Sequence, residues 1–205
     1  MTGSTQHRLS FAIAATAFLL VVLVGLGVSH GLFAAADRAV LLAVAAEPGS
    51  MSARIAGAFT WLGDARQRLT IAFVAALLLV LAREPRTGGA LLLMVASGML
   101  LVGVVKAVVA RPRPDLLPHL DIVASASFPS AHAASNMILW LAIALLPRRG
   151  AARGWILAGA LALAVAIGAS RVVLAVHWPS DVIAGWLLGA GWVMLWLPLG
   201  VARRR

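Results

Sequence analysis

Three short polar clusters interrupt this apolar chain, and their residue types suit the binding and transfer of a phosphoryl group. They occupy residues 106–114, 129–132 and 170–181. Together they hold cations that attract anionic oxygens, histidines that can attack phosphorus or move a proton, and a carboxylate that can orient an imidazole ring. If the fold brings the clusters together, they predict a site for phosphate chemistry.

The first cluster carries its cations where an apolar segment ends. Lys106 is followed by Arg111-Pro112-Arg113-Pro114, and proline both lacks a backbone donor and disfavours helix in the residue before it, so we expect an extended segment. Lys106 and Arg113 are candidate phosphate ligands, although a cation at a helix end can also act as a membrane anchor. Arg111 is interpreted as a contact to lipid headgroups.

The second cluster opens an apolar segment. Pro129 and Ser130 mark the start of a predicted helix, where unpaired backbone N–H groups and the positive end of the helix dipole favour an anion. Ser130 adds a hydroxyl group. His132 falls in the first turn, where it could donate a proton to a bound group.

The third cluster combines an arginine at the end of one apolar segment with an imidazole and a carboxylate before the next. Arg171 would be costly inside the hydrocarbon without a functional reason. His177 and Asp181 have a spacing at which the carboxylate can fix the tautomer of the imidazole. Two histidines and one aspartate could also bind zinc, but the nearby cations would repel a dication, so we expect neither a metal nor another cofactor.

Composition places these clusters in a membrane protein. Of the 205 residues, 62% are hydrophobic and 12% charged, whereas soluble domains have roughly 45–50% and about 25%. The net charge of +10 comes largely from arginines in short loops between apolar runs, which favours membrane topology and anionic lipids over a nucleic-acid partner. With no cysteine, disulfides and thiolate metal sites are excluded.

The apolar runs predict six membrane-spanning helices, since about 20 residues cross the hydrocarbon. We expect residues 30–68 to stay outside the membrane, with 51–62 as an amphipathic helix either at the interface or packed within a loop. The second span is short unless Gln67 and the snorkelling side chains of Arg66 and Arg68 extend its outer end. The predicted spans are 9–29, 69–82, 88–105, 131–146, 154–176 and 182–202.

Basic residues predict the orientation of these spans. Arginines near the N-terminus, at 83, 86, 148, 149 and 153, and at 203–205 favour both termini inside once the candidate site cations are set aside. All three clusters then fall on the outer face, in loops short enough to form one pocket. A cleaved signal peptide is the alternative for 9–29, but its apolar run exceeds the usual length of about 7–15 residues.

Together, the clusters resemble the three-part signature of the type 2 phosphatidic acid phosphatase (PAP2) superfamily. The patterns are Lys-x6-Arg-Pro from Lys106, Pro-Ser-x-His from Pro129 and Ser-Arg-x5-His-x3-Asp from Ser170, within about residues 100–190. Ala131 stands where the family usually has glycine. The resemblance implies one all-α domain over residues 1–205, a six-transmembrane-helix bundle with a short extracytoplasmic segment between its first two spans.

The resemblance also implies roles for the matching residues. His177 would attack phosphorus to form a phosphohistidine, Asp181 would orient it, and His132 would protonate the leaving group and then activate water. No metal is needed in such enzymes. The residues that would bind phosphate are Lys106, Arg113, Ser130, Ala131, Ser170 and Arg171.

The expected function is hydrolysis of a lipid phosphate or diphosphate at the outer face of a bacterial inner membrane. Undecaprenyl diphosphate, phosphatidylglycerophosphate and phosphatidate all fit, and an outer-face site favours the isoprenyl carrier. The alternatives are phosphotransfer to a second lipid, a binder impaired by Ala131, and a transporter, which the gathering of ionisable residues at one rim disfavours. Gly185 and Gly189 predict a helix-packing face, and the sequence gives no indication of oligomeric state.

Overall fold

The computed structural model of the protein describes residues 3–145 and 152–199, and all regular structure in these ranges is helical. This confirms the predicted all-α class. The helices are α1 (Gly3–Ser29), α2 (Ala34–Val44), α3 (Met51–Gly63), α4 (Ala65–Leu81), α5 (Pro85–Val109), α6 (Ala131–Leu145), α7 (Arg153–Val173) and α8 (Pro179–Trp196), followed by a short 3-10 helix, Leu197–Leu199.

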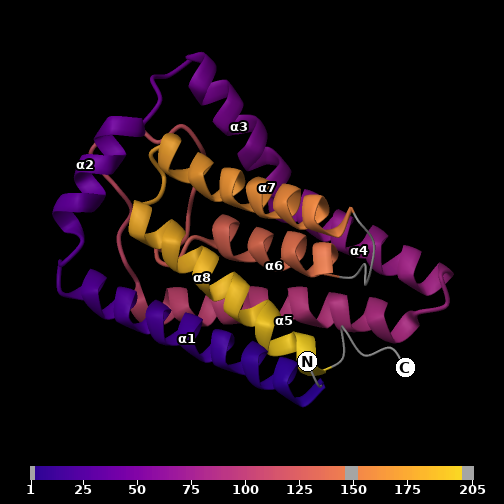
Figure 1. Ribbon diagram of the computed structural model, residues 1–205. Helices are drawn as coiled ribbons and strands as arrows, with labels where there is room; N and C mark the ends of the chain where they lie inside the picture. Colours follow the sequence, from indigo (N-terminus) through magenta and orange to yellow (C-terminus); the bar gives the residue numbers. More distant parts are fainter. Residues whose placement is uncertain (1–2, 146–151, 200–205) are drawn as a thin grey trace.

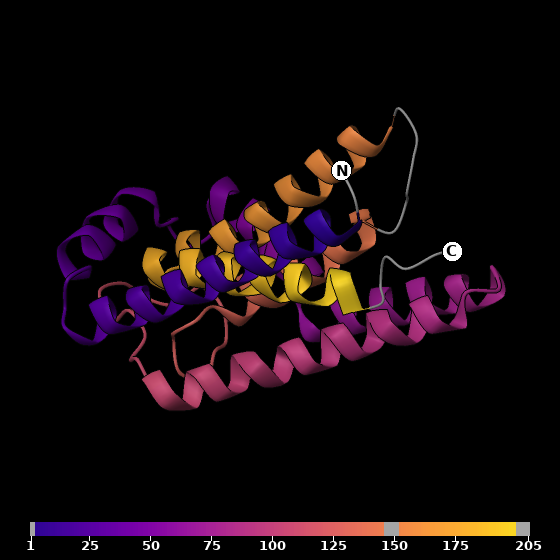
Figure 2. The ribbon, with the colours of Figure 1, turned by 60° about the horizontal axis from the view of Figure 1, so that its bottom comes forward.

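Helix α6 is the centre of the bundle. It packs against α5, α7 and α8, while α1 lies along α8 and α4 lies along α5 (Figures 1 and 2). Its residues from Ala133 to Leu139 are all buried, as expected for a helix enclosed on every side. The sequence gives α6 small residues at Ala133 and Ala134, which let its neighbours approach closely.

The bundle presents apolar side chains outward, as a lipid environment allows. Leu19, Phe73, Leu93 and Leu100 are among the exposed large hydrophobic side chains. Within the described residues, three helices have the length and composition of membrane spans: Ser4–Ser29, Pro85–Val109 and Arg153–Val173. These features support an integral membrane protein.

Two features of the predicted membrane boundaries lie outside the described residues. They are the ends of the fourth and sixth predicted spans, at residues 146 and 202, and part of the set of arginines used to orient the chain. That part comprises Arg148, Arg149, Arg203, Arg204 and Arg205.

The segment between the first two predicted spans has more structure than expected. Helix α3 agrees with the predicted helix at 51–62, and Ser50 caps it by accepting a hydrogen bond from the N–H of Ala53 at 3.1 Å. However, the prediction missed α2, which buries Asp37 and Leu41, one turn apart, against the bundle. Arg68 does not extend the second predicted span by snorkelling, because its side chain is buried and donates to the carbonyl of Gly63 at 3.0 Å.

The helix ends that carry the three polar clusters meet at one end of the bundle. The C-terminal ends of α5 and α7 and the N-terminal ends of α6 and α8 lie there beside α2 and α3, and the α4–α5 turn lies at the opposite end (Figure 1). Helix α5 is followed by Ala110, whose φ of 46° is left-handed, and residues 110–130 then cross this end before α6 begins. The expected clustering at one end is therefore observed.

Candidate active site

A cavity of about 370 Å³ lies at this end of the bundle. All three polar clusters contribute to its wall, and two carboxylates that the sequence analysis did not single out, Asp64 and Asp121, line it as well. The residues from the predicted site that line the cavity are Lys106, Arg113, Ala131, His132, Arg171 and His177.

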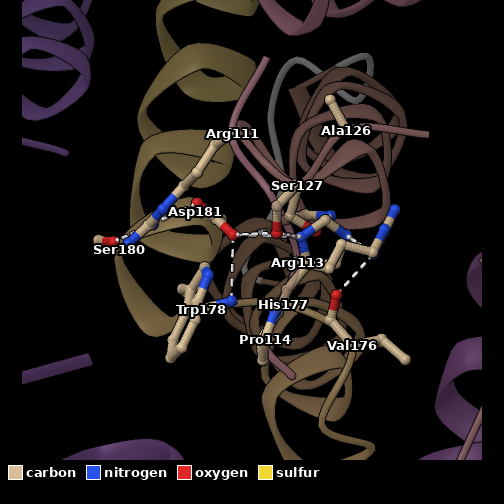
Figure 3. A network of polar contacts seen from close by, with 12 residues as sticks. Arg111, Arg113, Pro114, Ala126, Ser127, Val176, His177, Trp178, Ser180 and Asp181 are labelled. Carbon is tan, nitrogen blue, oxygen red and sulfur yellow. Dashed lines mark hydrogen bonds and ion pairs between the residues drawn. The ribbon is translucent and has the colours of Figure 1, made fainter. Parts of the chain in front are cut away.

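His177 lies between α7 and α8 with its ring buried (Figure 3). Its Nδ1 is 3.3 Å from the hydroxyl of Ser127 and 3.5 Å from Oδ2 of Asp181, and the same hydroxyl donates to that oxygen at 2.5 Å. Since Ser127 gives its proton to the carboxylate, its oxygen can only accept from His177. Nδ1 therefore carries the ring proton, and Nε2 keeps its lone pair.

The surroundings of His177 also keep it neutral. Burial lowers its pKa to about 3, and the charges of Arg113 and Lys106 act in the same direction, while Asp181 opposes them. Nε2 lies 3.2 Å from Nη1 of Arg113. A neutral imidazole with a free lone pair beside a cation is equipped to attack an electrophile bound to that cation.

Asp181 is fully buried in the first turn of α8 and anchors this arrangement. In addition to Ser127, it accepts the N–H of Trp178 at 3.0 Å and Nη1 of Arg111 at 2.6 Å. Its backbone carbonyl accepts the N–H of Ser130 at 2.9 Å, which ties the start of α6 to the start of α8.

Arg111 corrects an expectation, because it does not face lipid headgroups. Its guanidinium donates to Asp37 of α2 at 2.7 Å as well as to Asp181, and so bridges the two carboxylates. It also donates to Ser180 at 2.8 Å (Figure 3) and lies over the ring of Trp178. Both carboxylates are buried. Asp37 and Asp181 lie far apart in the sequence, and Arg111 binds both of them. Arg111 therefore helps to hold Asp181 in place.

The three cations of the cavity are held by different parts of the wall. Lys106 donates to the carbonyls of Ala126 and Ser127. Arg113 donates to the carbonyl of Ser125 at 2.8 Å and to that of Val176 at 2.6 Å. Its pKa is lowered, first by burial and then by the charge of Arg171, so the positive charges of Arg113 and Arg171 lie close enough to repel each other.

Arg171 is the third cation and is almost completely buried at the end of α7. Its Nη1 donates to the hydroxyl of Thr60 at 3.0 Å and to Asp121 at 2.6 Å, and its Nε has no hydrogen-bond partner among the described residues. Burial would raise the pKa of Asp121, but the hydrogen bond and charge of Arg171 outweigh it and hold that pKa below its usual value. The ionised carboxylate of Asp121 is thus bound to Arg171, and an anionic substrate would compete with it for the guanidinium group.

His132 stands across the cavity in the first turn of α6. Its Nε2 lies 3.0 Å from Oδ1 of Asp64, at the corner between α3 and α4. The backbone N–H groups of Ala131 and His132 belong to the first turn, where N–H groups have no partner within the helix. This end of α6 can receive phosphate oxygens.

The two predicted serine ligands lie behind the wall, and neither is among the described residues that line the cavity. The buried hydroxyl of Ser130 accepts the N–H of Ala133 at 3.4 Å. The hydroxyl of Ser170 donates to the carbonyl of Ile167 and lies 2.7 Å from Thr60, so it orients the hydroxyl that contacts Arg171. Their direct binding of phosphate stays a prediction.

The wall offers little to a metal ion. Within residues 3–145 and 152–199, no three His, Asp or Glu side chains come together as ligands, and the cations around the cavity suit an anion.

Residues missed by the sequence analysis are Asp37, Thr60, Asp64, Asp121 and Ser127. The scarcity of acids, 7 in the whole chain, is the one signal that could have singled out the aspartates.

Comparison with known proteins agrees with this geometry. The profile of the PAP2 superfamily matches residues 87–205. The crystal structure of a transmembrane PAP2-type phosphatidylglycerolphosphate phosphatase from Bacillus subtilis superimposes with a TM-score of 0.83 and 27% identity, covering 89% of this chain and 93% of that one. The predicted fold is therefore confirmed as PAP2-like.

Two curated relatives match a shorter part of the chain. An undecaprenyl-diphosphatase of Sulfolobus acidocaldarius is 35% identical over 125 residues, 58% of this chain and 58% of that protein. A decaprenylphosphoryl-5-phosphoribose phosphatase of Mycobacterium tuberculosis is 43% identical over 89 residues, 42% of this chain and 46% of that protein. The chain spans about half the length of the curated relatives it matches.

Proposed function

Since the chain belongs to the PAP2 superfamily, we propose that it is a membrane lipid phosphatase that hydrolyses a phosphomonoester or diphosphate bond in the cavity described above. The observation that carries this proposal is the neutral imidazole of His177, whose unprotonated Nε2 lies beside Arg113 in a cavity that also holds Lys106, Arg171 and His132. Such a cavity supplies a nucleophile, an anion site and a proton donor together.

In the first step, Nε2 of His177 attacks phosphorus, the N–P bond forms and the bond to the leaving oxygen breaks. His132 donates its proton to that oxygen, so that the lipid leaves as an alcohol or as a lipid monophosphate. The hydroxyl of Ser127 and the carboxylate of Asp181 stabilise the positive charge that develops on the His177 ring through Nδ1.

In the second step, water attacks the phosphohistidine. His132, now neutral, takes a proton from the water, the N–P bond breaks and inorganic phosphate leaves while His177 regains its lone pair. The cations stabilise the charge on the transferred group in both steps because they are fixed before the reaction begins. The proposed phosphate-binding residues are Lys106, Arg113, Ser130, Ala131, Ser170 and Arg171.

The proposed topology has six spans, α1 and α4 to α8, with α2 and α3 in an extracytoplasmic segment beside the active site. Helices α4 and α6, of 17 and 15 residues, are short for spans but alternate in direction with their longer neighbours. The chain has no cysteine, so single cysteines at exposed positions report the topology directly. In intact cells a membrane-impermeant maleimide should label Ile122→Cys and leave Arg83→Cys unlabelled; the reverse pattern would place the site on the inner face.

Among substrates, the proposed outer-face site and the names of two relatives favour an isoprenyl carrier phosphate or diphosphate, whereas the structural match to a phosphatidylglycerolphosphate phosphatase favours a glycerolipid phosphate. Phosphate release by the purified protein in detergent, measured on a panel of isoprenyl and glycerolipid phosphates in excess EDTA, tests both activity and preference. Release that survives EDTA and is abolished by His177→Ala is expected. Lack of release from every lipid by the folded protein would refute the proposal, and recovery of the phosphoryl group on a second lipid would assign phosphotransfer instead.

A further inference from the structure

The corner between α3 and α4 reaches the candidate active site from outside the region that matches the family profile. That profile covers residues 87–205, whereas the corner consists of Gly63 and Asp64. Oδ1 of Asp64 lies 3.0 Å from Nε2 of His132, and the side chain lines the cavity while staying 45% exposed. A carboxylate from a different part of the fold thus pairs with the second histidine of the site.

Several contacts hold this corner against α6. The carbonyl of Gly63 accepts Nδ2 of Asn136 at 2.9 Å and Nη1 of Arg68 at 3.0 Å. The same Asn136 amide donates to the carbonyl of His132 at 2.9 Å. One side chain of α6 therefore connects the backbone before Asp64 to the backbone of His132, and the burial of Arg68 serves the same corner.

The absence of a side chain at Gly63 allows this close approach. A Cβ atom there would lie 2.4 Å from Cγ2 of Ile167, 2.9 Å from the amide nitrogen of Asn136 and 3.2 Å from Cδ2 of His132. The first two distances are too short for the site to accept a methyl group without movement of the corner. Glycine at position 63 thus lets Asp64 lie within hydrogen-bond distance of the His132 ring.

We propose that Asp64 is the positioning residue for His132 and determines which of its ring nitrogens exchanges a proton. This rests on the proposed phosphatase function. Asp64 accepts from Nε2–H throughout the reaction, so Nδ1 gives its proton to the leaving oxygen in the first step. Nδ1 then takes a proton from water in the second step. Asp64 itself gains and loses no proton.

The charged groups around His132 make the role of Asp64 measurable. Besides Asp64, the ring interacts with the charges of Arg68 on α4, Arg171 on α7 and Asp121 in the loop between α5 and α6. Two of these neighbours are cations that oppose protonation of the ring. Loss of the Asp64 charge would therefore favour the neutral imidazole and reduce the fraction of His132 that carries the proton needed in the first step.

The test uses Asp64→Asn in the full-length protein, with Asp115→Asn, an exposed acid of the α5–α6 loop, as the matched control. We expect kcat to fall by about 10- to 100-fold, within the roughly 10²–10⁴-fold contribution of general acid–base catalysis, with KM nearly unchanged. The basic limb of the kcat–pH profile should move to lower pH, and Asp64→Glu should restore part of the rate. In a His132→Ala background, Asp64→Asn should cause no further loss.

Two outcomes would overturn the proposal. One is an Asp64→Asn variant whose kcat and pH profile equal those of the wild type. The other is an Asp64→Asn substitution that lowers kcat as much in the His132→Ala background as it does in the wild type. Ring ¹⁵N NMR of histidine-labelled protein, with the His132 signal assigned by His132→Ala, tests the same pair without any substrate. At a pH where the His132 ring is neutral, the wild type should show the Nε2–H tautomer, and Asp64→Asn should show a mixture. An inactive wild type that keeps this tautomer would refute the proposed phosphatase function while leaving the pairing established, and a mixed tautomer in the wild type would refute the pairing.

Discussion

Replacement of Arg111 by methionine tests whether this arginine is a structural part of the site. Its guanidinium lies 2.7 Å from Asp37 and 2.6 Å from Asp181, whose side chains are 3% and 0% exposed. Removal of one partner from a buried ion pair costs about 3–5 kcal/mol because the other charge remains buried. Asp37 keeps two hydrogen bonds from Ser180 and Asp181 keeps those from Ser127 and Trp178, so we expect a loss near 3 kcal/mol.

Thermal unfolding of the purified protein in detergent measures this loss. For a chain of this size, 1 kcal/mol corresponds to about 2–4 °C, so Arg111→Met should lower Tm by about 6–12 °C. Arg38→Met is the matched control, because Arg38 is exposed on the neighbouring helix α2 and surface substitutions change stability by about 0.5 kcal/mol or less.

A double-mutant cycle separates the ion pair from other effects of the substitution. Asp37→Asn and Arg111→Met should together lower Tm by clearly less than the sum of their separate effects, since the second change removes a charge left unpaired by the first. A Tm for Arg111→Met within about 2 °C of wild type, or additive effects in the cycle, would refute the buried network and restore a contact to lipid headgroups as the role of Arg111.

Three further predictions concern the cavity itself. Asp121→Asn should lower KM several-fold and strengthen inhibition by inorganic phosphate, because the carboxylate no longer competes for Arg171; unchanged values would contradict this competition. Ser127→Ala should lower kcat by about 10-fold, the effect of about 1.4 kcal/mol, and a wild-type kcat would show that its hydroxyl does not connect His177 to Asp181. The pKa of His177 is about 3 in the folded protein against about 6.5 when unfolded, so its contribution to stability is present above pH 6.5 and is lost as the pH falls towards 3. In Tm measurements from pH 7 to 4, His177→Gln should therefore flatten the decline seen in wild type, and equal slopes would contradict the lowered pKa.

The sequence was sufficient to predict the helical class and the meeting of the three clusters. Successive apolar helices run in opposite directions through the bundle. Their order alone therefore brings together the helix ends that carry Lys106, His132 and His177. The spacing of four between His177 and Asp181 placed both residues at the α7–α8 turn. These inferences succeeded because they depend on local pattern and on the direction of successive helices.

The supporting contacts were not predictable because they join residues far apart in the chain. Asp37 and Arg111 are separated by 74 positions, and Asp64 and His132 by 68. An isolated acid between apolar residues has no periodic partner that would reveal its contact. Hydropathy alone likewise assigns an arginine after a span to the headgroups, which explains the error for Arg111.

Close packing of α6 and α8 fixes the relative positions of the two histidines. A Cβ atom at Gly185 would lie 2.7 Å from the carbonyl of Ser130, and one at Gly189 would lie 2.4 Å from the carbonyl of Ala134. The packing face predicted from these glycines therefore faces α6. Without side chains between the two backbones, the first turns of α6 and α8 are close enough for the hydrogen bond between Ser130 N–H and the carbonyl of Asp181.

The alanine at position 131 is explained by the same helix start. Helix α6 begins at Ala131, and Ala131 is not among the non-glycine residues with positive φ, which in the described chain are Arg83, Ala110 and Ala175. The position therefore does not use the backbone freedom that distinguishes glycine. Its N–H group stays in the first turn, available to an anion. The departure from the family pattern thus requires no distortion of the site, which removes the structural reason for expecting an impaired binder.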